Sequence, residues 1–300
     1  MLKALKRESG NDRNSLIRSD VTVPGHDPTV TAETKISVTN INHYFKSSNG
    51  KATHALKNIS LDVADHEFVA IVGPSGCGKS TLLNIMSGLF KATEGNVYFD
   101  GQLLQGITPK IGYISQADAL MPWRTLTENA ELGLEIKGIS KAERREIAKD
   151  LIERTGLKGF ENSYPYELSG GMRKRASIIR TLALDPEVFF MDEPFGALDV
   201  FTREMLQDDI LKLWQETKKT IVFVTHDLAE AITLADRVVL MTARPSTIKA
   251  QYDIPLSRPR SALETRFERR FVELQKLIWN DLRGEVMKAR GNEAYECIEL

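Results

Sequence analysis

Short apolar runs recur along the chain and alternate with longer segments in which apolar residues are spaced as in helices. Residues 68–72 form a continuous apolar run, typical of a strand buried on both faces of a sheet, whereas residues 59–63 alternate as in a half-buried strand. Strands are predicted at 36–39, 59–63, 68–72, 96–99, 111–114, 188–191, 221–224 and 238–241, and helices after Lys79 and at 141–155, 171–183 and 202–217. This alternation predicts an α/β fold with a mainly parallel sheet covered by helices on both faces.

The same pattern divides the chain into parts. Residues 1–35 are polar without sustained periodicity and are interpreted as a mobile tail. Residues 36–245 form the predicted α/β domain, and within it strand signals give way, at about 117–170, to charge-rich sequence interpreted as a helical insertion. Residues 246–300 form a C-terminal extension with apolar residues at helical spacing. These predict an amphipathic helix that packs on the core or, alternatively, binds a partner: Phe267, Phe271, Leu274, Ile278 and Leu282.

Composition narrows the class of protein. The 300 residues include 40 Lys and Arg against 41 Asp and Glu, a net charge of −1, which argues against binding nucleic acid mainly through charge. The sequence holds no run of about eighteen uncharged apolar residues that would span a bilayer. Only two cysteines occur, Cys77 and Cys297, which gives no disulfide framework. We therefore expect a globular protein of the cytosol.

A phosphate-binding motif follows the apolar run at 68–72. Residues 73–80 match the pattern G-x-x-x-x-G-K-[ST] and lie between a predicted strand and a predicted helix. Backbone N–H groups of such a P-loop converge on phosphate at a helix N-terminus. Lys79 is expected to reach the β- and γ-phosphates, and the Ser80 hydroxyl to bind Mg²⁺. The residues expected to hold the nucleotide here are Gly73, Ser75, Gly76, Gly78, Lys79, Ser80 and Thr81.

Two carboxylates follow the predicted strand at 188–191. Ligands bind at the C-terminal ends of strands in open α/β sheets, so Asp192 is expected to bind Mg²⁺, directly or through water. Glu193 is expected to act as the general base that polarises the attacking water. A solvated turn is the alternative for an isolated Asp-Glu pair, but the P-loop upstream favours the catalytic role.

Residues 168–175, Leu-Ser-Gly-Gly-Met-Arg-Lys-Arg, resemble the signature motif of ABC-type ATPases. Gln116 is similar to the glutamine of that family's Q-loop, residues 197–199 to its D-loop and His226 to its switch histidine. Phe45 matches the aromatic that stacks on adenine, with Tyr44 as the adjacent candidate. The resemblance covers residues 36–245 and implies a P-loop NTPase core of ABC ATPase type, with an antiparallel β subdomain and a helical insertion subdomain. It adds Ser169, Gly170, Gly171 and Asp199 to the ATP site, Gln116 and His226 to catalysis, and Gln116 to the Mg²⁺ ligands.

The resemblance also implies a homodimer. Residues 169–171 precede a predicted helix and form a second anion cradle, suited to a γ-phosphate. If the family's geometry holds, one chain cannot close both cradles on one ATP. Two ATP molecules would then lie head to tail between the P-loop of one copy and Ser169 to Gly171 of the other.

Within the family, the chain is similar to the nitrate, sulfonate and taurine importers, in the signature and in residues 120–125, 243–245 and 255–260. Met172 stands where the usual signature has Gln, and a thioether is a poor hydrogen-bond acceptor. We therefore expect at most a changed nucleotide affinity. The likeness implies an ATPase at the cytoplasmic face of the inner membrane, a separate integral-membrane permease, a periplasmic solute-binding protein and no nucleic-acid partner.

Two other classes of P-loop protein fit this sequence less well. A soluble ABC ATPase of DNA repair, chromosome structure or translation would carry a long coiled coil or two fused cassettes. Here Lys79 and Ser169 lie only 90 positions apart, and one cassette is found. A P-loop kinase acting on a small molecule leaves residues 168–172 unexplained.

The helical insertion is expected to receive the permease. With Gln116, residues 117–167 lie between a γ-phosphate sensor and the signature, so that the nucleotide state can reach the surface there. Trp123 is the expected anchor if it is exposed, because aromatic residues dominate interface energies. A Trp123 buried in the core is the alternative.

Overall fold

The computed structural model describes residues 18–19, 34–46, 50, 52–196 and 198–290. In this part of the chain, seven strands form the main sheet, in the order β1-β11-β10-β4-β9-β8-β7. The strands from β10 to β7 are parallel, whereas β11 and β1 are antiparallel additions. Their bounds are Arg18–Ser19 for β1, Phe68–Val72 for β4, Ile111–Ile114 for β7, Val188–Asp192 for β8, Thr220–Val224 for β9, Arg237–Met241 for β10 and Ile248–Asp253 for β11.

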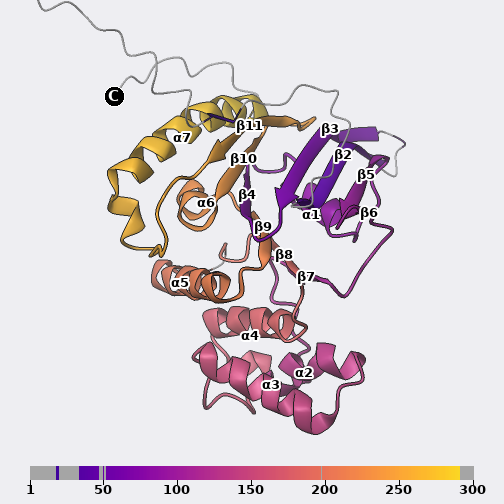
Figure 1. Cartoon of the computed structure of the whole chain (residues 1–300), viewed down its shortest axis with the longest axis vertical. Coiled ribbons are helices and arrows are strands. Elements are labelled where there is room, and N and C mark those ends of the chain that lie inside the picture. The colour runs from indigo at the N-terminus through magenta and orange to yellow at the C-terminus, as the bar shows by residue number, and fades with distance from the viewer. Residues whose placement is uncertain (1–17, 20–33, 47–49, 51, 197, 291–300) are drawn as a thin grey trace, which may run out of the picture.

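The strand β4 lies in the middle of this sheet and is buried on both faces, as its continuous apolar sequence predicts. Its even-numbered residues face one core and its odd-numbered residues face another. The first core is covered by α5 (Val200–Thr217), α6 (Leu228–Leu234) and α7 (Arg269–Ala289) (Figure 1). The second is covered by α1 (Lys79–Met86) and a second sheet.

The second sheet is antiparallel, with strand order β3-β2-β5-β6. Its strands are β2 (Thr34–Lys46), β3 (Ala52–Ala64), β5 (Glu94–Phe99) and β6 (Gln102–Leu103). This is the antiparallel subdomain that the resemblance implied. The strand β2 starts inside the segment interpreted as a tail, because Lys35 is buried and ion-paired with Asp100 at 2.8 Å and Glu187 at 2.5 Å. Of the remaining tail, only β1 belongs to the described residues.

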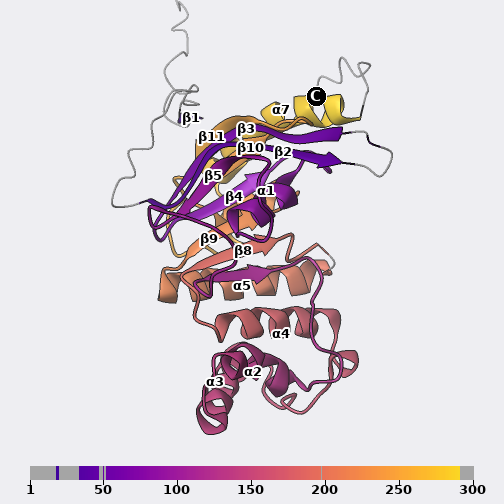
Figure 2. The same ribbon diagram turned by 90° about the vertical axis from the view of Figure 1, so that its right-hand side faces the viewer.

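A helical subdomain lies at one end of the molecule (Figures 1 and 2). It contains α2 (Leu126–Ile136), α3 (Lys141–Arg154), a 3-10 turn at Pro165–Glu167 and α4 (Gly170–Leu182). The expected insertion ended near residue 170, but α4 continues the subdomain, because its Ala176 and Ile179 complete the small apolar core of α2 and α3. The opposite side of α4 contacts the main core through Ile178.

The C-terminal extension is joined to the core. Its first part, β11, pairs with β10, and α7 buries an apolar stripe of Phe271, Leu274, Ile278 and Leu282 against α6 and the sheet. Phe267 was wrongly included in this stripe: it precedes α7 in a 3-10 turn (Thr265–Phe267) and its side chain is 81% exposed. No helix among the described residues is long and apolar enough to cross a membrane.

Candidate functional site

The P-loop joins β4 to α1. Gly76 and Gly78 have φ angles of +72° and +120°, which residues with a Cβ rarely adopt, and a Cβ on Gly78 would lie 2.9 Å from Cδ2 of Leu56. These glycines let the chain turn sharply into α1, whose first N–H groups have no acceptor within the helix. The turn therefore presents backbone donors and the positive end of a helix dipole at one place, which suits a phosphate.

Lys79 lies across the inside of this loop. Its Nζ donates to the carbonyl oxygens of Gly73 and Pro74, both at 3.0 Å, and the residue is only 5% exposed. Three other residues of the predicted cradle are exposed to solvent: Ser75, Gly76 and Ser80. Cys77 is buried, and burial raises the pKa of its thiol, in agreement with a packing role.

Ser80 and Asp192 lie together although they are far apart in the sequence. The Ser80 hydroxyl donates to Oδ1 of Asp192 at 2.8 Å, and the Tyr113 hydroxyl also hydrogen-bonds this carboxylate. Burial raises the pKa of Asp192 above its ordinary value. A hydroxyl and a carboxylate oxygen at the mouth of a phosphate cradle are ligands that Mg²⁺ prefers, so these residues fit the metal that the sequence implied.

Glu193, Gln116 and His226 converge beside this pair. Oε2 of Glu193 lies 3.1 Å from Nδ1 of His226. A Cβ placed on Gly196 would lie 3.8 Å from Oε2 of Glu193 and 3.9 Å from Nε2 of Gln116. Glu193 has a φ of +43°, a strained conformation for a residue other than glycine, fixed by a hydrogen bond from its N–H to the Val224 carbonyl at 2.9 Å. The sequence assigned catalytic roles to all three side chains, and the structure places Glu193 and Gln116 beside Gly196 and His226 beside Glu193.

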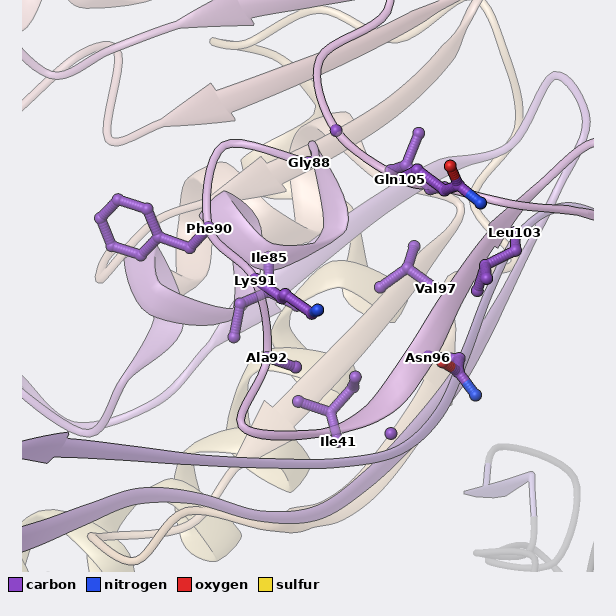
Figure 3. A pocket seen from close by; sticks show the side chains of 13 residues that line it. Ile41, Ile85, Gly88, Phe90, Lys91, Ala92, Asn96, Val97, Leu103 and Gln105 are labelled. Atoms are coloured by element: carbon purple, nitrogen blue, oxygen red, sulfur yellow. The ribbon is translucent and has the colours of Figure 1, made fainter.

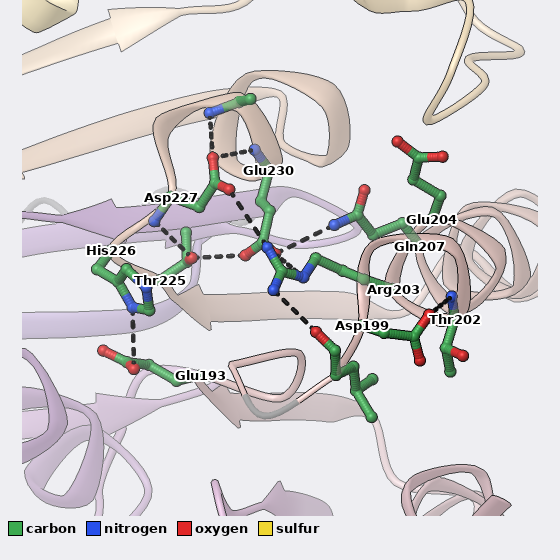
Figure 4. Close-up of polar contacts among 12 residues, drawn as sticks. Glu193, Asp199, Thr202, Arg203, Glu204, Gln207, Thr225, His226, Asp227 and Glu230 are labelled. Atoms are coloured by element: carbon green, nitrogen blue, oxygen red, sulfur yellow. Dashed lines mark hydrogen bonds and ion pairs between the residues drawn. The ribbon is translucent and has the colours of Figure 1, made fainter. Parts of the chain in front are cut away.

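A buried polar network supports the loop that carries His226 (Figure 4). The Thr225 hydroxyl donates to Oε2 of Glu230 at 2.6 Å, and Nε2 of Gln207 donates to Oε1 at 3.2 Å. Burial raises the pKa of Glu230, and Arg203 lies 3.8 Å from both Glu230 and Asp227. Sequence reasoning missed Glu230, whose position on α6 gives no motif signal.

The signature residues lie at the start of α4. Ser169 is the N-cap of this helix, and its hydroxyl accepts from the Met172 N–H at 3.3 Å. A Cβ on Gly171 would lie 2.4 Å from Cγ2 of Thr202, so a larger residue there would force Thr202 to move. Met172, the departure from the usual signature, packs against the apolar core of the helical subdomain.

Asp199 is the N-cap of α5, and its Oδ1 accepts from the Thr202 N–H at 3.1 Å. Hydrogen bonds from Thr202 lower the pKa of this carboxyl. Ala197, the first residue of the predicted D-loop, lies outside the described residues. Through Thr202, Asp199 is brought beside Gly171 of its own chain.

Three basic residues of α4 tie the signature helix to the Q-loop. Buried Lys174 donates to the carbonyls of Ser115 at 2.7 Å and Gln116 at 3.1 Å, and burial lowers its pKa. Arg173 pairs with Asp118 at 3.1 Å, and Arg180 donates to the Ala119 carbonyl. The sequence showed this basic run but gave no sign that it would contact the segment after β7.

Phe45 lies at the end of β2 and is 43% exposed. Its ring meets His43 edge to face at 4.8 Å, whereas the neighbouring Tyr44 has one face stacked on His54 at 4.1 Å. Because one face of the Tyr44 ring is already covered by His54, Phe45 is the better of the two candidates for stacking on a base.

A pocket of about 430 Å³ lies between the C-terminal end of α1 and the antiparallel sheet (Figure 3). It contains none of the predicted site residues, and its walls include Ile85, Phe90, Val97 and Leu103. The P-loop lies at the other end of α1, about 12 Å away for a helix of 8 residues. This pocket is therefore separate from the phosphate cradle.

The predicted residues thus form two groups. One comprises the P-loop with Gln116, Asp192, Glu193 and His226, and the other comprises Ser169 to Gly171 with Asp199. The P-loop leads into α1 and the signature begins α4, and these two helices lie on opposite sides of β8 and β9 (Figures 1 and 2).

Known proteins are similar to this chain over most of its length. The family model described as ABC transporter matches residues 56–196. An uncharacterized ABC transporter ATP-binding protein of Methanocaldococcus jannaschii is 51% identical over 85% of this chain and 94% of its own length. An aliphatic sulfonates import ATP-binding protein of Bacillus thuringiensis is 42% identical over 78% of this chain and 91% of its own. A taurine import ATP-binding protein of Rhizobium johnstonii is 40% identical over 72% and 82%.

Solved structures are similar as well. A dimeric ATP-binding cassette in a post-hydrolysis state, bound to ADP and phosphate, superposes with a TM-score of 0.66. It is 34% identical and covers 74% of this chain and 100% of its own. With the P-loop, the signature helix and the switch histidine in the places described above, the chain belongs to the family of ABC transporter ATP-binding proteins.

Proposed function

We propose that the protein hydrolyses ATP at a site built from its P-loop and from the signature of a second copy, and that this reaction powers import of a small anionic solute. The observation that carries the proposal is the convergence of Ser80, Asp192, Glu193 and His226 beside the phosphate cradle. The separation of the signature helix from this cradle supports a second copy as the source of Ser169 to Gly171.

Different residues of the chain bind the phosphates, hold the metal and activate the water. Backbone N–H groups of the P-loop and Lys79 hold the phosphates, and Phe45 stacks on adenine. Ser80 and Asp192, with Gln116, would hold Mg²⁺, which neutralises phosphate charge when bound. Glu193 accepts the proton of the water that attacks the γ-phosphorus, and ADP leaves as the bond to the β-phosphate oxygen breaks. His226, hydrogen-bonded to Glu193, orients that water and the γ-phosphate.

The solute and the partners follow from the relatives. Proteins named for taurine and aliphatic sulfonate import are similar over most of this chain. We infer a sulfonate- or nitrate-like anion as the solute, delivered by a periplasmic binding protein to an integral-membrane permease. In this assembly the chain lies at the cytoplasmic face of the membrane. Trp123, which is 71% exposed on the helical subdomain, supports docking of the permease there.

Transport by the assembled complex tests this function. The chain is co-expressed with a candidate integral-membrane permease from the same genome, purified with it and placed in lipid vesicles. ATP is supplied on the side of the ATPase, with binding protein and labelled taurine, an alkanesulfonate or nitrate on the other. ATP-dependent uptake of one of these solutes is expected. Copurification with RNA or DNA in place of a permease would contradict the assignment.

A further inference from the structure

The loop at residues 242–247, between β10 and β11, lies against the phosphate cradle. Its Arg244 donates from Nη2 to the carbonyl oxygen of Gly76, in the middle of the P-loop. Buried Ser246 fixes the loop from beneath: its N–H donates to the Ala55 carbonyl at 3.0 Å, and its carbonyl accepts from the Lys57 N–H at 2.8 Å. The guanidinium is thus carried by a loop that is hydrogen-bonded to the strand beside the P-loop.

The other side of the same loop is held by the C-terminal helix. Oε2 of Glu285, on α7, accepts from the Ala243 N–H at 3.1 Å. The Glu285 side chain is only 4% exposed, and its Oε1 lies 3.0 Å from Nζ of both Lys249 and Lys288. Two hydrogen bonds, joined by the covalent chain of Ala243 and Arg244, therefore connect α7 to Gly76.

The contact falls where the P-loop needs support. Gly76 has a φ of +72°, and its carbonyl shares a rigid peptide plane with the N–H of Cys77. A charge-assisted hydrogen bond to that carbonyl fixes the plane and so limits the conformations that the loop can adopt. A cradle built from backbone N–H groups binds phosphate more tightly when its peptides are already oriented, because less conformational entropy is lost on binding.

We infer that Arg244 is a positioning residue of the nucleotide site, and that Glu285 sets the loop that carries it. The C-terminal helix α7 then contributes to ATP affinity although it does not contact the nucleotide. The inference rests on the phosphate-binding role proposed for the P-loop. Neither Arg244 nor Glu285 belongs to the motifs that identify the ATP site.

The test compares ATP affinity with turnover in the full chain. For Arg244→Ala we expect the KM for ATP, and the Kd for a fluorescent ATP analogue, to rise about tenfold, as for loss of one charge-assisted hydrogen bond. The kcat at saturating ATP should stay within about twofold of the parent value. Arg244→Lys, which keeps a cationic donor, should recover part of the affinity. Arg244 is exposed, so the variant is expected to fold, and Arg244→Gln is measured beside it as a second variant.

The relay from α7 is tested in the same assays. Glu285→Ala should raise KM about threefold and should add nothing further in the Arg244→Ala background, because the two residues act in series. Glu273→Ala is the control, since Glu273 lies on the same helix and its ion pairs within the described part of the chain are with Arg269 and Arg270. That variant should keep the parent KM.

The possible results separate the two hypotheses. If the parent chain and Lys79→Ala bind the ATP analogue equally well, the role proposed for the P-loop is wrong. If Lys79→Ala abolishes binding while Arg244→Ala, Arg244→Gln and Glu285→Ala keep the parent KM and Kd, only the present inference is overturned. A fall in kcat with an unchanged KM would also overturn it, because such a fall reports a smaller folded fraction.

Discussion

At the scale of single residues, the proposed chemistry depends on the carboxylate of Glu193, whose backbone is strained. Glu193 is held at a φ of +43° at the end of β8, with Oε2 3.1 Å from Nδ1 of His226. Ser80 and Asp192, 2.8 Å apart, lie next to it. The strain is stored where a proton acceptor must be aimed at water, which favours Glu193 over the neighbouring Asp192 as the base.

Replacing Glu193 by Gln keeps the shape of the side chain but removes its ability to accept a proton. We expect the ATPase rate to fall by about 10² to 10⁴, with ATP binding retained. The variant should accumulate as an ATP-loaded dimer on size-exclusion chromatography. The control is Glu146→Gln, an exposed glutamate of α3, which should hydrolyse ATP at the parent rate. If Glu193→Gln also hydrolyses at that rate, Gln116 or His226 must take the role of the base.

The residues that could be predicted from the sequence are those with a motif or an apolar pattern. The P-loop, Asp192, Glu193 and His226 follow buried strands, and those strands were recognisable as apolar runs. Four charged residues are buried as well: Lys35, Lys174, Glu230 and Glu285. A hydropathy pattern assigns charged residues to the solvent-exposed surface and therefore misplaces them. Each has at least one partner distant in sequence, such as Glu187 for Lys35, so the fold is needed to show why burial is tolerated.

At the scale of elements, an ion-pair network joins the two sheets. Glu187, just before β8, accepts from Lys35 of β2 at 2.5 Å and lies 3.0 Å from Lys110, before β7. The hydrogen bonds from Lys35 and Lys110 lower the pKa of Glu187 below its ordinary value of 4.5. Its contribution to stability is therefore complete above about pH 4.5 and is lost as the pH falls through the lower pKa of the folded state.

The replacement of Glu187 by Gln should reduce the thermal unfolding temperature near neutral pH. The difference from the parent should shrink as the pH falls below about 4.5, because the parent carboxylate is then protonated too. Calorimetry of both proteins between pH 3 and 7 measures this difference, with high salt as a further check on its electrostatic origin. A difference that stays constant over this range would mean that packing, and not charge, is responsible.

The helical subdomain should carry the contact with the permease. Trp123 is 71% exposed and stands before α2, close in sequence to the Q-loop. The replacement Trp123→Ala should weaken copurification with the permease by about ten- to thirtyfold, as for an aromatic anchor of an interface, and leave the ATPase rate of the free subunit unchanged. Ile136→Ala, which alters an equally exposed apolar residue at the end of α2, is the control. Unchanged assembly and transport in the Trp123 variant would place docking elsewhere.

At the scale of the whole molecule, α1, which follows the P-loop, and α4, which begins at the signature, pack on opposite faces of the main sheet. We expect from this arrangement that two chains complete one site. A Lys79→Ala copy lacks the lysine of its P-loop and a Ser169→Arg copy has a disrupted signature, so each should be inactive alone. In a mixed pair, the cradle of the second copy faces the signature of the first, and one site of the two is intact. Mixing should therefore restore ATPase activity well above the sum of the separate variants, and the specific activity of the parent should rise with protein concentration. If each site lay within one chain, mixing would restore nothing, and the parent's specific activity would be constant at dilutions where sedimentation detects only monomer.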